Sequence, residues 1–155
     1  FRVAIGLEKS ASGLILLTND GDLLQRIAVS YRELPRSFSI RVKGKLSEQA
    51  FERGTKGLNF EGRRVVLENL KELKLEKERA FYECSVLDHR DQMLEKVFMQ
   101  LQAPIQRISQ IAIAGLRDDL LTKGKGRALT LKELQQLRTT LDLPNLDSPN
   151  LDLPT

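Results

Sequence analysis

Residues 13–23, GLILLTNDGDL, constrain the fold of this chain more than any other segment. The apolar run over residues 13–18 is short, which favours a buried strand. The chain then breaks at an Asn-Asp-Gly turn, and Asp20 is a preferred residue for capping the start of a helix. A helix from there to about Ser30 would place three apolar side chains on one face: Leu23, Leu24 and Ile27. The segment therefore predicts a short buried strand followed at once by an amphipathic helix.

The rest of the chain mixes strand and helix patterns without regular alternation. Strict alternation of apolar and polar residues predicts a half-buried strand over residues 37–43. Further strands are expected over residues 67–79, 80–87 and 105–114, although charge pairing in the first of these also fits a helix. Helices are expected after Ser47, over residues 92–102, and from the capping box of Thr130 and Glu133 to about Thr139. This order predicts an α+β fold.

Composition and charge set limits on the class of protein. The 155 residues are 41% hydrophobic, which is typical of a globular protein and too high for a disordered one. No apolar run approaches the roughly 20 residues of a membrane-spanning helix, so no membrane association is expected. The single cysteine, Cys84, cannot form an internal disulfide, and we expect it to be a small apolar residue within a strand. The first residue is Phe1 rather than Met, which suggests a fragment of a longer protein.

The C-terminal segment differs in composition from the rest. Residues 141–155 read LDLPN, LDSPN and LDLPT, three near-copies of one pentapeptide whose prolines forbid a continuous helix. We expect an extended, solvated tail, and the alternative is a docking strip for another protein. The tail contains three Asp and no Lys or Arg, so residues 1–140 carry a formal charge of +7, against +4 for the whole chain. A basic body of this kind permits a polyanionic partner but does not require one.

Residues 12–23, SGLILLTNDGDL, resemble the signature of the RsuA-type ribosomal RNA pseudouridine synthases, in which G-R-L-D precedes G-L-L-L-L-T-N-D-G-D-L by a few residues. Four later segments are also similar to parts of that family. They are RSFSIRVKGKL, KGLNFEG, YECSVLDHRDQMLEKVFMQLQAPIQRI and GKGRALTLKEL. The similarity covers about residues 3 to 140.

The resemblance implies a fold, an activity and a partner. The expected fold is a mixed, mostly antiparallel sheet flanked by helices, with residues 1–140 as the catalytic domain and residues 141–155 as the tail. The family's small RNA-binding domain and the first strand of its catalytic domain would lie upstream of Phe1. The implied activity is isomerisation of a uridine in ribosomal RNA, without metal or cofactor. The resemblance also suggests a monomer in the cytoplasm, or in the stroma or matrix of an organelle.

The family's chemistry needs a carboxylate, a cation beside it, and an aromatic ring that stacks on the base after the base has left its stack. An ungapped alignment puts Glu8 at the position of the nucleophilic Asp and Phe38 at that of the stacking Tyr. It puts Gly6 at the position of the neighbouring Arg, and Glu95 at that of the Arg that pairs with the carboxylate. Glu8 keeps the carboxylate but moves it by one methylene, and a misplacement near 1 Å can cost about 100-fold in rate.

These departures predict an RNA-binding domain whose activity is weak or lost. Two alternatives stay open: an active synthase that uses Glu8, and a protein-interaction domain without catalysis. Glu8 could also be an ordinary solvated residue. A cation within about 4 Å of the Glu8 carboxylate would favour an enzyme, whereas Glu95 as the nearest charged group would favour a pseudoenzyme.

Basic residues of the matching segments are candidates for contacts with RNA phosphates. Arg90 retains the first Arg of the family's loop motif, and Lys96 takes the place of its last one. The expected RNA contacts are Arg36, Arg41, Lys43, Arg90, Lys96, Lys123, Lys125 and Arg127. For the glycine-containing loop over residues 123–127, a solvated surface is the simpler interpretation. His89 is expected to be a turn residue, and Asp118 and Asp119 are expected to lie in a solvated loop.

Overall fold

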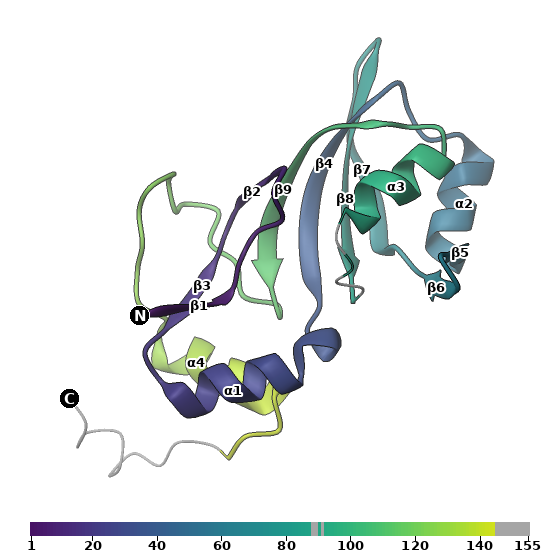
Figure 1. Ribbon diagram of the computed structural model, residues 1–155. Helices are drawn as coiled ribbons and strands as arrows, with labels where there is room; N and C mark the ends of the chain where they lie inside the picture. Colours follow the sequence, from purple (N-terminus) through teal and green to yellow (C-terminus); the bar gives the residue numbers. More distant parts are fainter. Residues whose placement is uncertain (88–89, 91, 145–155) are drawn as a thin grey trace.

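The computed structural model describes residues 1–87, 90 and 92–144, and its centre is a five-stranded sheet (Figure 1). The strands run in the order β2-β9-β4-β8-β7. β2 pairs with β9 in parallel, and the other three pairings are antiparallel. The bounds are Ala11–Gly13 for β2, Ile105–Ile113 for β9, Arg36–Lys43 for β4, Arg79–Val86 for β8 and Glu68–Leu75 for β7. The expected α+β fold with a mixed, mostly antiparallel sheet is confirmed.

The single strand expected over residues 13–18 is in fact two strands in different sheets. Gly13 ends β2 beside Gln110 of β9, whereas β3 (Leu16–Thr18) pairs with β1 (Arg2–Ile5) in a separate two-stranded sheet. Gly13 has a φ of 119°, and a Cβ atom there would lie 2.2 Å from the carbonyl oxygen of Gln110. Only glycine permits this close approach, so the chain changes sheet at this point.

Helix boundaries follow the capping residues of the sequence. Asp20 caps α1 (Gly21–Val29) by accepting hydrogen bonds from the amides of Asp22 and Leu23. Ser47 caps α2 (Glu48–Lys56), and Thr130 and Glu133 form the capping box that opens α4 (Leu131–Thr140). The remaining helices are the short 3-10 helix η1 (Tyr31–Glu33) and α3 (Met93–Gln100). Each of the four α-helices in the described part of the chain lies where the sequence predicts one.

The apolar side chains form two separate cores. The larger one covers one face of the sheet, where Phe38, Ile40 and Val42 of β4 pack with α2, α3 and the hairpin of β5 (Leu58–Phe60) and β6 (Arg63–Val65). The second core joins α1, α4 and β1 at the other end of the molecule and includes Ile27 and Leu137 (Figure 1). Both elements at the ends of the chain therefore contribute to this second core.

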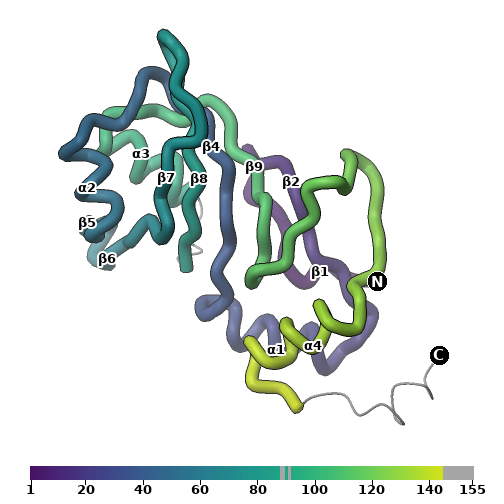
Figure 2. The backbone as a smooth tube through the Cα atoms, turned by 180° about the vertical axis from the view of Figure 1, so that it is seen from behind, coloured from purple at the N-terminus to yellow at the C-terminus, as the bar shows by residue number. Residues whose placement is uncertain are grey.

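The opposite face of the sheet is open. In the view from behind, β4, β7 and β8 lie in front of α2 and α3, and no helix of the described part covers them (Figure 2). Within residues 67–79 lies the edge strand β7 (Glu68–Leu75), so the strand interpretation of this segment is confirmed. Its alternating Lys and Glu residues are typical of a protected sheet edge.

Two expectations fall outside the described residues. His89 and residues 145–155, which make up most of the repeat segment, are among the positions that the structure does not describe. The extended tail therefore stays a prediction. In the described part of the chain, no helix has the length and apolar character needed to span a membrane.

Candidate active site

Glu8 lies in the loop that connects β1 to β2, and it is paired with a buried cation. The Nη2 atom of Arg36 is 3.8 Å from Oε1 of Glu8. The side chain of Arg36 is 3% exposed and that of Glu8 is 13% exposed. A buried guanidinium is costly unless an anion compensates it, so the Glu8 carboxylate offsets part of the cost of burying Arg36.

Other groups hold Arg36 in position. Its guanidinium carbon lies 5.9 Å from the ring centroid of Tyr31 and 5.4 Å from that of Phe38, within the range of cation–π attraction. Its Nη1 atom lies 3.4 Å from Oε1 of Gln110. Its Nε atom is buried and has no hydrogen-bond partner among the described residues. The arginine is therefore clamped between two rings while one of its donors stays unsatisfied.

Gln110 connects this arginine to the backbone on both sides of Glu8. Its Nε2 atom donates to the carbonyl oxygens of Gly6, at 3.2 Å, and Leu14, at 2.7 Å. Gln110 is 1% exposed and lies on a core-facing position of β9, between Ile108 and Ala112. The sequence analysis missed it, although a polar residue in phase with the apolar positions of residues 105–114 was a signal that could have found it.

The expected surface role of Arg36 does not agree with its position. Arg36 was predicted to contact RNA phosphate, but it points to the core side of β4, in phase with Phe38 and Ile40. The alternation of β4 explains this orientation, because residues two apart share a face. The ring of Phe38, which was expected to stack on the base, is 1% exposed and belongs to the larger core, so it presents no free face to a base here.

Glu95 does reach the loop that carries Glu8, as the alignment suggested. It lies in the first turn of α3 and accepts a hydrogen bond from Oγ of Ser10, two residues after Glu8. A carboxylate in the first turn of a helix is favoured by the helix dipole. Glu95 is thus engaged by Ser10, while the charge of Glu8 is balanced by Arg36 from β4.

Arg90 and Lys96 contact the β5–β6 hairpin. Nη1 of Arg90 donates to the carbonyl oxygen of Phe60 at 2.8 Å, and its guanidinium lies 4.7 Å from the Phe60 ring centroid. Nζ of Lys96 is 3.8 Å from Oε1 of Glu61. Both cations tie the region of α3 to this hairpin, and Lys96 remains half exposed.

Arg127 holds together the loop that precedes α4. Its Nε atom lies 2.6 Å from Oδ2 of Asp118, and its two terminal nitrogens bind the Glu133 carboxylate at 2.7 and 2.9 Å. Hydrogen bonds from Arg127 and from the amide of Thr130 lower the pKa of Glu133 to about 2. The same guanidinium lowers the pKa of Asp118. Arg127 and Asp118 therefore brace the loop, while Lys123 and Lys125 are exposed on it.

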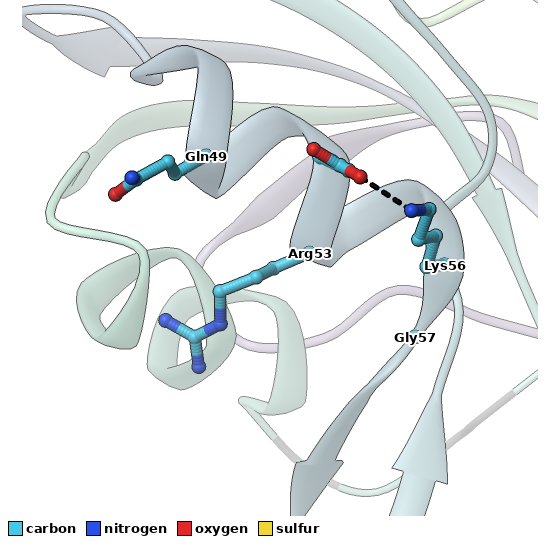
Figure 3. Close-up of a pocket in the computed structure, with 5 residues that line it drawn as sticks. Gln49, Arg53, Lys56 and Gly57 are labelled. Atoms are coloured by element: carbon cyan, nitrogen blue, oxygen red, sulfur yellow. Dashed lines mark hydrogen bonds and ion pairs between the residues drawn. The ribbon is translucent and has the colours of Figure 1, made fainter.

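A surface depression on α2 lies apart from these residues. It is lined by Gln49, Glu52, Arg53, Lys56 and Gly57, and Lys56 forms an ion pair with Glu52 across it (Figure 3). None of the predicted site residues lines it. Among the described residues, no cluster of three or more His, Cys, Asp or Glu side chains could hold a metal ion.

Comparison with known proteins finds relatives among the RNA pseudouridine synthases. The chain matches no family model. It is 28% identical over 131 residues to an uncharacterized RNA pseudouridine synthase of Aquifex aeolicus, a match that covers 84% of this chain and 53% of the relative. It is 27% identical over 150 residues to ribosomal large subunit pseudouridine synthase B of Haemophilus influenzae, covering 92% of this chain and 40% of the relative.

The chain is similar to RNA pseudouridine synthases, among them ribosomal large subunit pseudouridine synthase B. A crystal structure of a pseudouridylate synthase has the same fold, with a TM-score of 0.71 at 20% identity over 87% of this chain and 58% of that one. The chain spans about half the length of the curated relatives it matches. It is thus a pseudouridine synthase-like domain.

Proposed function

We propose that this domain is the catalytic part of a ribosomal RNA pseudouridine synthase, with Glu8 as its essential carboxylate. The observation that carries the proposal is the distance of 3.8 Å between Glu8 and the buried Arg36. A cation at this distance attracts the negative charge on which nucleophilic or electrostatic catalysis by a carboxylate depends. The names of the relatives support ribosomal RNA as the substrate, and hence a location where ribosomes are assembled, in the cytoplasm or an organelle.

In this proposal, two residues position the Glu8 loop while the substrate rearranges. Arg36 and Gln110 fix the position of the loop that carries Glu8, and little of the Glu8 carboxylate meets water. The glycosidic bond from the sugar to N1 of uracil breaks, the base turns, and a bond from the same sugar carbon to C5 forms. The proton at C5 then leaves to water, and N1, freed from the sugar, takes up a proton from water. The product is an isomer of the substrate, so no net oxidant or reductant is consumed.

A second candidate function is RNA binding without catalysis. It is favoured by the burial of Phe38, which is 1% exposed, and by Gly6 and Glu95 at two positions where the family has Arg. Under this interpretation the Glu8–Arg36 pair is a structural remnant that stabilises the loop. The two functions differ in whether the domain turns over a uridine.

Release of tritium from C5-labelled uridine in ribosomal RNA fragments separates the two candidates. Because one group would perform the chemistry, Glu8→Gln should lower the rate by at least about 100-fold, since the amide lacks the negative charge. Glu68→Gln, at an exposed position of β7, is the matched control and should keep the wild-type rate. Turnover that survives Glu8→Gln would exclude Glu8, and RNA binding by a wild-type protein that never releases tritium would establish the second candidate.

A further inference from the structure

The open face of the sheet carries an aromatic side chain in the middle of a basic area. Phe81 of β8 lies between the core residues Ala80 and Tyr82, so its side chain points to the opposite, open face, where it is partly exposed. In the view from behind, no helix of the described part lies in front of β8 (Figure 2). The part of an aromatic ring that remains exposed to water costs free energy, which makes Phe81 a candidate contact for a partner.

Two cations lie beside this ring, and two more lie in register with it on the next two strands of the sheet. Nζ of Lys74 and the guanidinium carbon of Arg79 each lie 5.9 Å from the Phe81 ring centroid. Arg41 is the cross-strand partner of Phe81 in β4, and Arg107 is the partner of Arg41 in β9. Arg107, Arg41, Phe81 and Lys74 thus form one row across β9, β4, β8 and β7, which we call the Phe81 row.

The charge of the Phe81 row is only partly neutralised within the protein. Glu76 forms ion pairs with Lys74 and Arg79 at the end of the hairpin. Arg41 and Arg107, by contrast, form no ion pair with any described residue, although like charges directly opposite each other destabilise a sheet. The Nε atom of Arg41 is also buried without a hydrogen-bond partner among those residues. An anionic ligand bound to the terminal nitrogens of the two guanidinium groups would relieve the repulsion.

We propose that the Phe81 row binds single-stranded RNA, with a base stacked on Phe81 and phosphates bound by Arg41 and Arg107. Single-stranded nucleic acid is recognised by open sheets and grooves that combine exposed aromatic rings with cations along the backbone path. A protein partner would have to match a ring enclosed by cations, whereas RNA supplies a stacking base and a phosphate at each nucleotide. The site lies on the opposite face from Phe38 and Arg36, so it goes beyond the proposed catalytic role and does not depend on it.

Binding of a fluorescein-labelled oligouridine of twelve nucleotides, measured by fluorescence anisotropy over a range of salt, tests the proposal. Arg41→Gln with Arg107→Gln should weaken binding and reduce the slope of log K against log salt by about 1.4, since each phosphate contact on a single strand contributes about 0.7. Arg53→Gln with Arg63→Gln removes the same charge from exposed positions of α2 and β6 and should leave that slope nearly unchanged. Phe81→Leu should weaken binding by about 5- to 150-fold, the usual worth of one base–aromatic stack, and Phe81→Trp should restore it.

Four results would overturn the proposal. They are the absence of binding by the folded wild-type protein at 50 mM salt, equal losses in the two arginine pairs, an unchanged affinity in Phe81→Leu, and tighter binding of an RNA duplex of the same length. Circular dichroism and the thermal midpoint establish that each variant is folded. Glu8→Gln should bind the oligouridine as the wild type does. The binding test of the Phe81 row therefore does not depend on whether Glu8 is catalytic.

Discussion

Replacement of Arg36 by Gln should destabilise the protein far more than loss of an exposed cation. The substitution leaves the Glu8 carboxylate, which is 13% exposed, without the guanidinium 3.8 Å away. Removing one partner of a fully buried pair costs about 3–5 kcal/mol. The separation here is long and Glu8 retains some access to water, so we expect about 2–3 kcal/mol. In a chain of this size that corresponds to a fall in Tm of roughly 5–10 °C.

A double-mutant cycle in urea separates the ion pair from the other contacts of Arg36. Glu8→Gln in the Arg36→Gln background should recover at least about 1 kcal/mol, because no uncompensated carboxylate remains. Lys71→Gln is the matched control, since its Nζ lies 3.5 Å from Oε2 of Glu83 but is 60% exposed, and it should cost below about 1 kcal/mol. Strict additivity of the Glu8 and Arg36 changes would refute the pairing on which the candidate site rests.

Three further predictions concern other parts of the fold. In urea denaturation, Gly13→Ala should lower the free energy of unfolding by more than about 3 kcal/mol or prevent folding, because its Cβ would overlap the Gln110 backbone at a φ of 119°. Gly21→Ala is the control, since its Cβ meets no atom within 4 Å, and it should be neutral or stabilising. Glu133 has its pKa lowered from 4.5 to about 2 by Arg127, so its contribution to stability is complete above about pH 5 and is lost as the pH falls towards 2. The stability difference between wild type and Glu133→Gln in urea should therefore be largest near pH 7 and shrink towards pH 2, and a difference that grows on acidification would contradict the ion pair. Burial, with a smaller effect of Glu83, raises the pKa of Cys84 to about 12. A thiol reagent at pH 8 should therefore leave the native protein unmodified and label Cys84 only in urea. Rapid labelling of the folded protein would show that β8 opens.

Local signals in the sequence predict the elements of this fold well. Asp20, Ser47 and Thr130 each begin a helix because their side chains accept hydrogen bonds from free amides at that end. The alternation over residues 37–43 likewise gives β4 and its buried face. The single strand over residues 13–18 was wrong because strand propensity does not tell which partner a strand finds, and Gly13 lets the chain change partner.

The candidate site was less predictable, because it depends on pairings between distant segments. Glu8 and Arg36 are brought together by the sheet, and no local pattern links them. The phase of β4 nevertheless contained part of the answer, since Arg36 shares the face of Phe38 and a basic residue on a core face needs an anion. Residue type alone suggested a phosphate contact, whereas residue type and strand phase together indicate a buried pair.

The two hydrophobic cores meet at the polar residues of the candidate site. The chain passes from Leu34 in the second core, just before β4, through Arg36 to Phe38 in the larger one. β9 crosses in the opposite direction through Gln110, and the loop with Glu8 connects Ile5 of the second core to Ala11 beside the larger one. Glu8, Arg36 and Gln110 thus lie between the two cores. A rotation of one core against the other would change the distance between the Glu8 carboxylate and the Arg36 guanidinium. This ion pair therefore responds to how closely the two cores pack.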